Sequence, residues 1–303
     1  EIRKMGLTDF VGAVTDGLYG AVAFDFKSPH DMLTAKKAWF FFDEEYVCLG
    51  TDINSQPDLP VVTTINQVLM RSVVTIQQNS VLKKLTKGDH ELDNVKWVYQ
   101  DRIGYILPEP TSLSLSNQVE EGRWSDITDQ KNISEEIVSK EVFNLGFNHG
   151  NSPDNASYQY IVVPDVSIER IKETSRNNRG IEILSNTSDL QAVKSNKLGI
   201  AYLAFYKSGE IEISKGNKVR MDSQGMAMLR MKGRRIVELS VSDPSRKLSR
   251  VMLSITGIYN SQENHCKTYP DKEQNTTQVI VDLPQGFYLG NSVSIKLNHG
   301  VSE

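Results

Sequence analysis

The sequence has few of the patterns that mark catalytic, metal-binding or membrane proteins. Its five histidines are scattered along the chain without an HExxH or other paired spacing, and no P-loop, GxGxxG turn or Gly-x-Ser-x-Gly elbow occurs. No apolar run approaches the roughly 18 residues that span a bilayer. Spacing alone therefore predicts no metal site, no cofactor and no membrane partner, and calcium binding is left open.

Cysteine is also scarce, with two residues in a chain of 303. Cys48 lies in the apolar run 46–49, which predicts a buried thiol. Cys266 follows His265 in a polar segment, but this pair alone is not a zinc site, since zinc takes about four ligands at recognisable spacing. Whether Cys48 and Cys266 form a disulfide is left open, and with it the redox compartment.

Positive charge is not in excess, because the formal net charge is −4 at pH 7. This balance argues against a nucleic-acid partner. From Lys207 to Arg250, however, 11 Lys and Arg residues stand against five Asp and Glu residues. Two interpretations of this basic stretch stay open. It forms solvated strand faces and turns, or it forms a patch that attracts an anionic polymer.

Strand patterns dominate what is present. Val22, Phe24 and Phe26 alternate with other residues and so share one face of a predicted strand. Continuous apolar runs at 39–42, 160–163 and 200–205 are typical of strands buried on both faces, as in stacked sheets. Turn signals that recur too often for long helices separate the strands, at Asp16-Gly17, Ser208-Gly209, Lys215-Gly216, Lys232-Gly233 and Pro284-Gln285-Gly286. The sequence predicts an all-β fold.

One helix is predicted, over residues 166–177, with Asp165 or Ser167 as its N-cap. A further turn or two of helix is expected over 188–195. The change from an apolar strand to Gly, Lys and Ser residues at 207–222 predicts a domain boundary there. The chain then divides into a large sandwich over 1–215 and a small C-terminal sandwich over 216–303.

His149 is the most interesting histidine, because it precedes the polar loop 151–155 and then an apolar strand. A catalytic role is one reading. A histidine that hydrogen-bonds the loop backbone is the reading we favour.

Several segments are distinctive as strings. Residues 35–42 read Ala-Lys-Lys-Ala-Trp-Phe-Phe-Phe, and Cys-Leu-Gly-Thr follows at 48–51 and Val-Thr-Thr-Ile-Asn-Gln at 62–67. Further on lie His149-Gly150, Asn-Ala-Ser-Tyr at 155–158 and Tyr-Ile-Val-Val-Pro at 160–164. This succession resembles the central β-domain of the family 8 polysaccharide lyases, bacterial enzymes that cleave chondroitin and hyaluronan. It covers residues 1 to about 205, and the remainder resembles the family's small C-terminal sandwich by position and strand content.

The resemblance implies a large antiparallel β-supersandwich followed by a small β-sandwich, in a secreted or periplasmic bacterial protein. It also implies an α/α-toroid domain of the same parent chain, which supplies the Asn, His, Tyr and Arg of the β-elimination and is not part of this sequence. The chain begins at Glu1 rather than Met, which suggests a fragment. We therefore expect this chain to form one wall of a cleft for an anionic polysaccharide and to be inactive alone.

Three residues are candidates for the site on this resemblance. Glu1 matches by position a glutamate that supports the catalytic Tyr and Arg of the family. Asn54 and Gln56 lie in the loop between two motif strands and are candidates for contact with substrate. Which glycosaminoglycan is cut, and whether attack is endo or exo, stays open.

Two alternatives stay open beside the lyase. One is a non-catalytic carbohydrate-binding β-sandwich module without an enzymatic parent. The other is a sugar mutarotase-type epimerase, which needs a His and a Glu in one sandwich cleft and for which His149 is the histidine to nominate.

Overall fold

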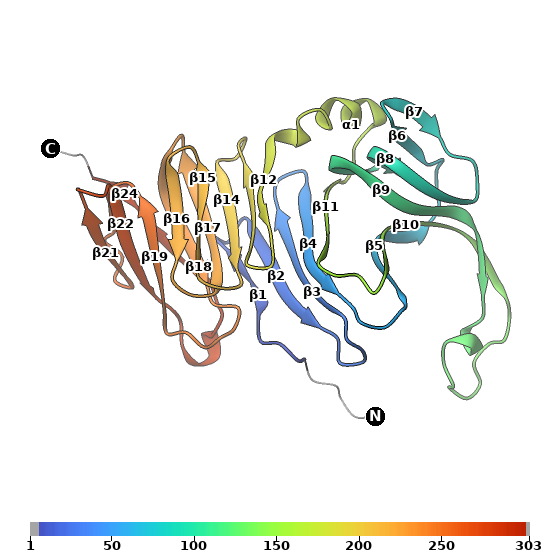
Figure 1. The fold of residues 1–303 in the computed structure, drawn as a ribbon, viewed down its shortest axis with the longest axis horizontal. Helices are drawn as coiled ribbons and strands as arrows, with labels where there is room; N and C mark the ends of the chain where they lie inside the picture. The colour runs from blue at the N-terminus through green and yellow to red at the C-terminus, as the bar shows by residue number, and fades with distance from the viewer. Residues whose placement is uncertain (1–5, 301–303) are drawn as a thin grey trace. The chain divides into compact units, whose positions relative to one another are not determined.

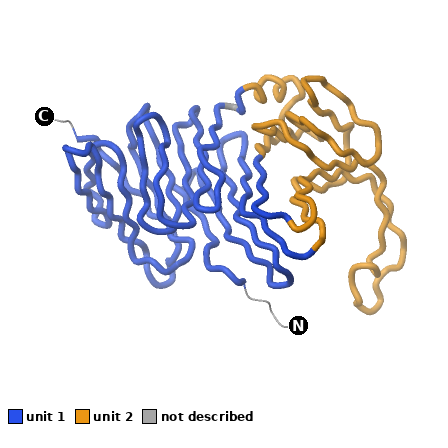
Figure 2. Tube along the Cα trace, viewed as in Figure 1, with its two compact units in different colours: residues 1–57, 153–159, 177–303 blue, residues 58–152, 160–176 orange. Residues whose placement is uncertain are grey.

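The computed structural model describes residues 6–300, apart from the side chain of Arg179. Strands make up most of this range, and the one α-helix within it, α1, spans Ile168–Thr174 (Figure 1). The described chain divides into two compact units (Figure 2). Unit 1 comprises residues 1–57, 153–159 and 177–303, and unit 2 comprises residues 58–152 and 160–176.

Unit 1 contains three sets of strands, each with neighbouring strands hydrogen-bonded. The first set is a meander of four strands with the start of β11 (Ala156–Val163) beside its last strand. Its strands are β1 (Val11–Thr15), β2 (Gly20–Lys27), β3 (Thr34–Phe41) and β4 (Tyr46–Asn54). The second set, in spatial order, is β12 (Ile181–Asn186), β13 (Leu190–Ser195), β14 (Ile200–Phe205), β17 (Gly225–Lys232), β18 (Arg235–Ser242) and β23 (Val293–Lys296).

The third set is a five-stranded sheet. Its order is β15 (Gly209–Ser214), β16 (Asn217–Met221), β19 (Arg250–Thr256), β22 (Thr276–Asp282) and β21 (Cys266–Asp271). A short ladder pairs β20 (Tyr259–Asn260) with β24 (Asn298–His299).

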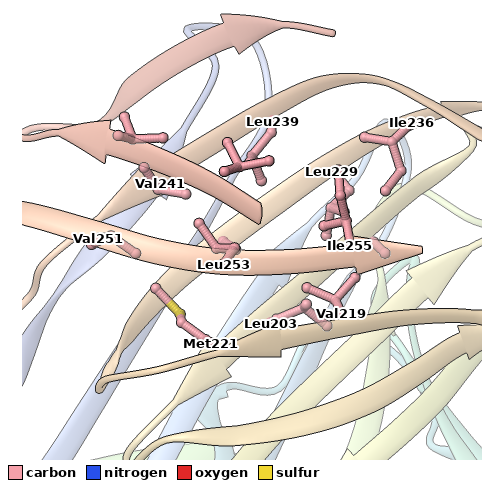
Figure 3. Packing of buried hydrophobic residues seen from close by; sticks show 14 of the residues in the cluster. Leu203, Val219, Met221, Leu229, Ile236, Leu239, Val241, Val251, Leu253 and Ile255 are labelled. Atoms are coloured by element: carbon pink, nitrogen blue, oxygen red, sulfur yellow. The ribbon is translucent and has the colours of Figure 1, made fainter. Parts of the chain in front are cut away.

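The six-stranded sheet and the five-stranded sheet enclose one apolar core (Figure 3). Leu203, Leu229 and Leu239 of the first sheet and Val219 and Leu253 of the second belong to the same buried cluster, and each is fully buried. Apolar side chains on the inner faces of two stacked sheets form the core of a β-sandwich. The hydrophobic effect therefore holds these two sheets together.

The six-stranded sheet is covered on its other face as well. The Tyr202 hydroxyl of β14 donates to the Phe41 carbonyl at 2.8 Å, and the Ser242 hydroxyl of β18 donates to the Ala13 carbonyl at 2.7 Å. All six residues of β14 are buried. The apolar run at 200–205 is therefore continuous because its strand is buried on both faces, as predicted.

Unit 2 is built around the long strand β9 (Ile103–Gly122), which pairs with β8, β10 and the end of β11. Its other strands are β5 (Pro60–Leu69), β6 (Thr75–Gln78), β7 (Val81–Lys84), β8 (Asp89–Gln100) and β10 (Val138–Asn151). Helix α1 packs against β9 through Ile171, at a point where β9 has Gly104. A Cβ on Gly104 would lie 2.3 Å from the Ile171 Cδ1 atom, so glycine is what lets the helix approach.

The all-β prediction is confirmed, and the predicted helix at 166–177 is confirmed over a shorter range. Ser167 is its N-cap, since the Ser167 hydroxyl accepts from the Arg170 N–H at 3.2 Å. The helical turns expected over 188–195 are wrong. That segment contains β13, which pairs with β12 and β14 on its two sides, and this pairing overrides the local helix signal.

Both cysteines are buried, and neither forms a disulfide. This confirms the prediction for Cys48 and shows that the polar segment around Cys266 still turns its sulfur inward. The sequence-based division at residue 215 stays a prediction.

Candidate functional site

The loop after β4 contains the two predicted substrate contacts. Asn54 lies at the end of β4, where its Oδ1 accepts from the Asn155 N–H at 2.6 Å. Its Nδ2 donates to the backbone carbonyl of Asp52 at 2.9 Å and to Asp52 Oδ1 at 2.8 Å. The Ser55 N–H donates to the Pro153 carbonyl at 3.0 Å. Asn54 thus fastens the loop after β4 to the segment before β11, while the Gln56 side chain is exposed.

An ion pair connects two of the motif strands below this loop. Lys36 Nζ of β3 lies 2.9 Å from Asp52 Oδ2 of β4 and 3.8 Å from Asp25 Oδ1 of β2. The same ammonium lies 5.5 Å from the centroid of the Tyr206 ring. Lys36 of β3 therefore contacts charged groups on β2 and β4 and the Tyr206 ring, so this motif lysine stabilises the packing of these strands.

The two carboxyl groups of this cluster differ in their pKa. Burial acts against the charged form of Asp52, but the hydrogen bonds from Lys36 and Asn54 outweigh it and hold the pKa of Asp52 below its usual value. Burial raises the pKa of Asp25, and the more distant Lys36 offsets this only in part. Asp52 is thus the carboxylate that Lys36 and Asn54 keep ionised.

His149 lies near the end of β10 in unit 2. Its Nε2 is 2.9 Å from the Thr63 hydroxyl of the neighbouring strand β5, and its ring stacks on Phe147 with centroids 6.4 Å apart. Phe147 pairs with Thr63 in the β5–β10 register. The hydrogen bond at Nε2 is therefore to a side chain of the adjacent strand, and the predicted bond from His149 to loop backbone stays a prediction.

Glu1 lies outside the described residues, so its supporting role stays a prediction. Within residues 6–300, no group of three or more His, Cys, Asp and Glu side chains could hold a metal ion. In the same range no helix is long and apolar enough to cross a membrane. That Asn54 and Gln56 contact substrate also stays a prediction.

Cations of the basic stretch 207–250 pair with carboxylates in at least six cases. Ion pairs of this stretch include Lys207–Asp189 at 2.7 Å, Lys218–Glu210 at 2.8 Å, Arg220–Asp222 at 3.0 Å, Arg250–Asp282 at 3.5 Å, Arg230–Asp16 and Lys247–Asp9. Paired charges attract a polyanion less than free ones do. The pairing therefore favours solvated strand faces over an anion-binding patch.

A pocket of about 720 Å³ in unit 2 was not predicted from the sequence. It lies between the β6–β7 turn, the middle of β8 and the end of α1, and Asn79, Asn94, Lys96, Lys172 and Arg176 are among its lining residues. These residues come from three distant segments, and none belongs to a motif. The turn signal Asn79-Ser80 is the one local feature that marks any part of it.

Comparison with known proteins gives matches along nearly the whole chain. Residues 1–175 match the family model of the polysaccharide lyase family 8 super-sandwich domain, and residues 182–252 match that of the family 8 C-terminal β-sandwich domain. The chain is 34% identical over 296 residues to a chondroitinase-AC of Pedobacter heparinus, covering 97% of this chain and 39% of that protein. It is 26% identical over 240 residues to a xanthan lyase of Bacillus sp. (strain GL1), covering 76% of this chain and 25% of that protein.

A solved structure of a chondroitinase AC lyase superposes on 96% of this chain and 40% of its own length, with a TM-score of 0.83 and 34% identity. These matches confirm the predicted order of a β-supersandwich followed by a C-terminal β-sandwich. The chain spans about two fifths of the length of the chondroitinases that it matches.

Proposed function

Because the chain belongs to polysaccharide lyase family 8, we propose that it is the β-portion of a bacterial lyase that cleaves chondroitin or hyaluronan by β-elimination at a uronic acid. The observation that carries this proposal is the 34% identity to a chondroitinase-AC over 97% of the chain. The remaining length of such relatives has no counterpart here, which leaves room for the toroid that the family resemblance implies. A binding module without an enzymatic parent does not account for two consecutive family 8 matches.

The proposed reaction removes a weakly acidic proton. The C5 proton of a uronic acid becomes acidic enough to leave when an Asn and a basic group neutralise the adjacent carboxylate. A Tyr or His then takes the proton, the electrons left at C5 form a C4–C5 double bond as the C4–O bond breaks, and an acid protonates the departing glycosidic oxygen. These groups belong to the proposed toroid, and Glu1 is proposed to support the Tyr and the Arg among them.

The present chain is proposed to supply one wall of the substrate cleft. Asn54 supports this role indirectly, since its Oδ1 fastens the start of the loop that carries Gln56 to Asn155, and its Nδ2 bonds Asp52 of β4. Holding a loop in one conformation lowers the entropy lost when a ligand binds to it. The division into domains 1–215 and 216–303 and a secreted or periplasmic location belong to the same proposal.

The proposal is tested by measuring unsaturated products through their ultraviolet absorbance near the enoate band. We expect the parent protein to release them from chondroitin or hyaluronan, and the 303-residue chain alone to release none. Product formation by the chain alone would refute the split site. Activity of the parent on xanthan but on neither glycosaminoglycan would refute the substrate class.

A variant pair tests the loop. In the parent protein, Gln56→Ala is expected to raise KM severalfold, because the exposed Gln56 side chain is proposed to contact substrate. Gln274→Ala, which changes another exposed glutamine, in the β21–β22 turn, serves as the matched control and should leave KM unchanged. Equal KM values for both variants would remove Gln56 from the site.

A further inference from the structure

The pocket in unit 2 carries positive charge with no opposing charge in its lining. Lys96, Lys172 and Arg176 line it, and the described residues that line it include no Asp or Glu. Lys172 is exposed on α1 and Arg176 is exposed just after its C-cap Ser175. Within the described part of the chain neither lies within 4.0 Å of a carboxylate, although Glu169 and Glu173 are on the helix. Two cations at the mouth are therefore free to pair with a ligand.

The third cation lies deeper. Lys96 is half-buried on β8, and its ammonium donates to the Pro108 carbonyl at 3.1 Å. Burial lowers the pKa of Lys96, and the nearby Glu109 offsets this only in part. An anion in the pocket would stabilise the charged form of Lys96.

Backbone irregularities direct polar side chains to the same place. Asn79 and Ser80 form the β6–β7 turn with φ of 48° and 65°, and Asn94 has φ of 53° at a register shift in β8. The Asn79 N–H donates to the Asn94 carbonyl at 3.2 Å, which ties the turn to the bulge. Bulges redirect side chains that a regular strand would place elsewhere. Both Asn amides line the pocket, and in the described residues neither has a side-chain hydrogen bond.

Apolar surface completes the lining. Leu82 of β7 is 46% exposed, Pro110 of β9 is exposed, and both line the pocket. A sugar ring presents hydroxyl groups at its edge and C–H groups on its faces. Unpaired amides, small apolar walls and free cations together fit a sugar that also bears a negative charge.

We propose that this pocket is an accessory site that binds one acidic sugar unit of a polysaccharide through its carboxylate or sulfate group. The identity of that polysaccharide as a glycosaminoglycan rests on the proposed function, whereas the charge of the ligand rests on the lining alone. The site would hold the polymer on unit 2 by contacts that take no part in bond cleavage. Its volume of about 720 Å³ lies within the range of ligand pockets.

The experiment uses the 303-residue chain labelled with ¹⁵N at its tryptophan indoles. The Trp97 Nε1–H donates to Gln77 Oε1, and both residues line the pocket, so the Trp97 indole signal reports on binding. Trp39 lies in unit 1 and serves as the internal reference. We expect a chondroitin 4-sulfate tetrasaccharide to shift the Trp97 signal and to leave that of Trp39 in place.

Charge variants test the assignment. The double variant Lys172→Gln/Arg176→Gln should bind about tenfold more weakly, since each exposed charged contact contributes severalfold. The matched control, Lys232→Gln/Arg235→Gln, removes two exposed cations from the β17–β18 hairpin and should change affinity less than twofold. Equal losses in both variants would overturn the site and point to the basic stretch 207–250.

Three further ligands distinguish the carboxylate from the sulfate as the group that the pocket binds. Unsulfated chondroitin tetrasaccharide tests the carboxylate, inorganic sulfate tests the sulfate, and a carboxyl-reduced unsulfated tetrasaccharide tests the neutral sugar. A shift with either charged form and none with the neutral one supports the proposal. Binding of the neutral form as tightly as the charged forms, or no Trp97 shift with any of them, overturns it. A parent protein that cleaves no glycosaminoglycan while Trp97 still responds would overturn the proposed function and leave the pocket standing.

Discussion

The Gly50→Ala substitution tests a close contact between β4 and Tyr158 in unit 1. Gly50 lies in β4, and a Cβ added there would be 2.0 Å from Cε1 and 2.3 Å from Cζ of the Tyr158 ring. Carbon atoms of neighbouring side chains normally lie about 3.5–4.0 Å apart. The ring would therefore have to move by about 1.5 Å. Tyr158 is only 5% exposed, so it has little space to move into.

Gly50→Ala is expected to lower the free energy of unfolding by about 3 kcal/mol, at the upper end of the range for overpacking of a buried site. Gly122→Ala is the matched control, because a Cβ at Gly122 meets no atom within 4 Å and its φ is not positive. That substitution should change stability by less than about 0.5 kcal/mol. The two variants make the same chemical change, so their difference isolates the contact with Tyr158.

Urea unfolding followed by the indole signals measures both variants, with Trp39 reporting unit 1 and Trp97 reporting unit 2. Tyr158→Ala alone should cost about 3–5 kcal/mol, as for other large buried aromatic residues. Adding Gly50→Ala to Tyr158→Ala should then cost almost nothing more, because the clash is gone. A stable Gly50→Ala variant, or additive losses in the double variant, would refute this account.

Three further predictions follow from named contacts. Asp16→Asn should lower the free energy of unfolding, measured in urea, by about 2 kcal/mol, because it leaves Arg230 without its buried partner. Its control is Asp271→Asn, because the Asp271 carboxylate caps a similar turn; this change should lower the free energy of unfolding by less than about 0.5 kcal/mol. Burial opposes ionisation of Asp16, but Arg230 and backbone N–H groups outweigh it and lower its pKa, so this stabilisation is present above about pH 4 and is lost as pH falls through the lower folded value. A constant gap between wild type and D16N down to pH 2 would contradict this. Ser167→Ala should weaken α1 by about 1 kcal/mol, seen as about fivefold faster hydrogen exchange of the Ile171 amide, and an unchanged rate would remove Ser167 as its N-cap.

Strand positions were predictable where burial imposes a simple pattern. The run 200–205 is apolar throughout because sheets cover both faces of β14, and the sequence carries that signature directly. The helix predicted over 188–195 is not formed, because there the local sequence pattern and the tertiary pairing disagree. The polar residues 187–189 resemble a helix start, but they form the turn between β12 and β13, and the paired strands decide the conformation. Local signals are thus reliable where tertiary burial agrees with them.

The candidate site likewise has one part that the sequence predicted and one part that it did not. Asn54 was nominated from its place between two motif strands, and the structure shows both ends of its amide bonded to the chain itself. The pocket of unit 2 was missed, because its cations come from β8, from α1 and from the residues just after α1, and are far apart in sequence. No spacing rule connects Lys96 to Arg176, since only the packing of α1 on β9 brings them to one cavity.

Residues of the motif strings, or residues beside them, contact one another in the structure. Gly50 makes room for Tyr158, Lys36 pairs with Asp52, and Asn54 holds Asn155. Each of these contacts joins one string to another strand or segment, so changing a motif residue should lower the urea midpoint.

Residues that bind a ligand have the opposite property, because they stay unpaired until it arrives. Lys172 and Arg176 are exposed, and their substitution should leave the urea midpoint unchanged while weakening the Trp97 response. Urea midpoints and Trp97 responses measured on the same set of variants therefore separate the residues that stabilise this fold from those that would bind its ligand. A motif variant that keeps its midpoint, or a pocket variant that unfolds early, would contradict that division.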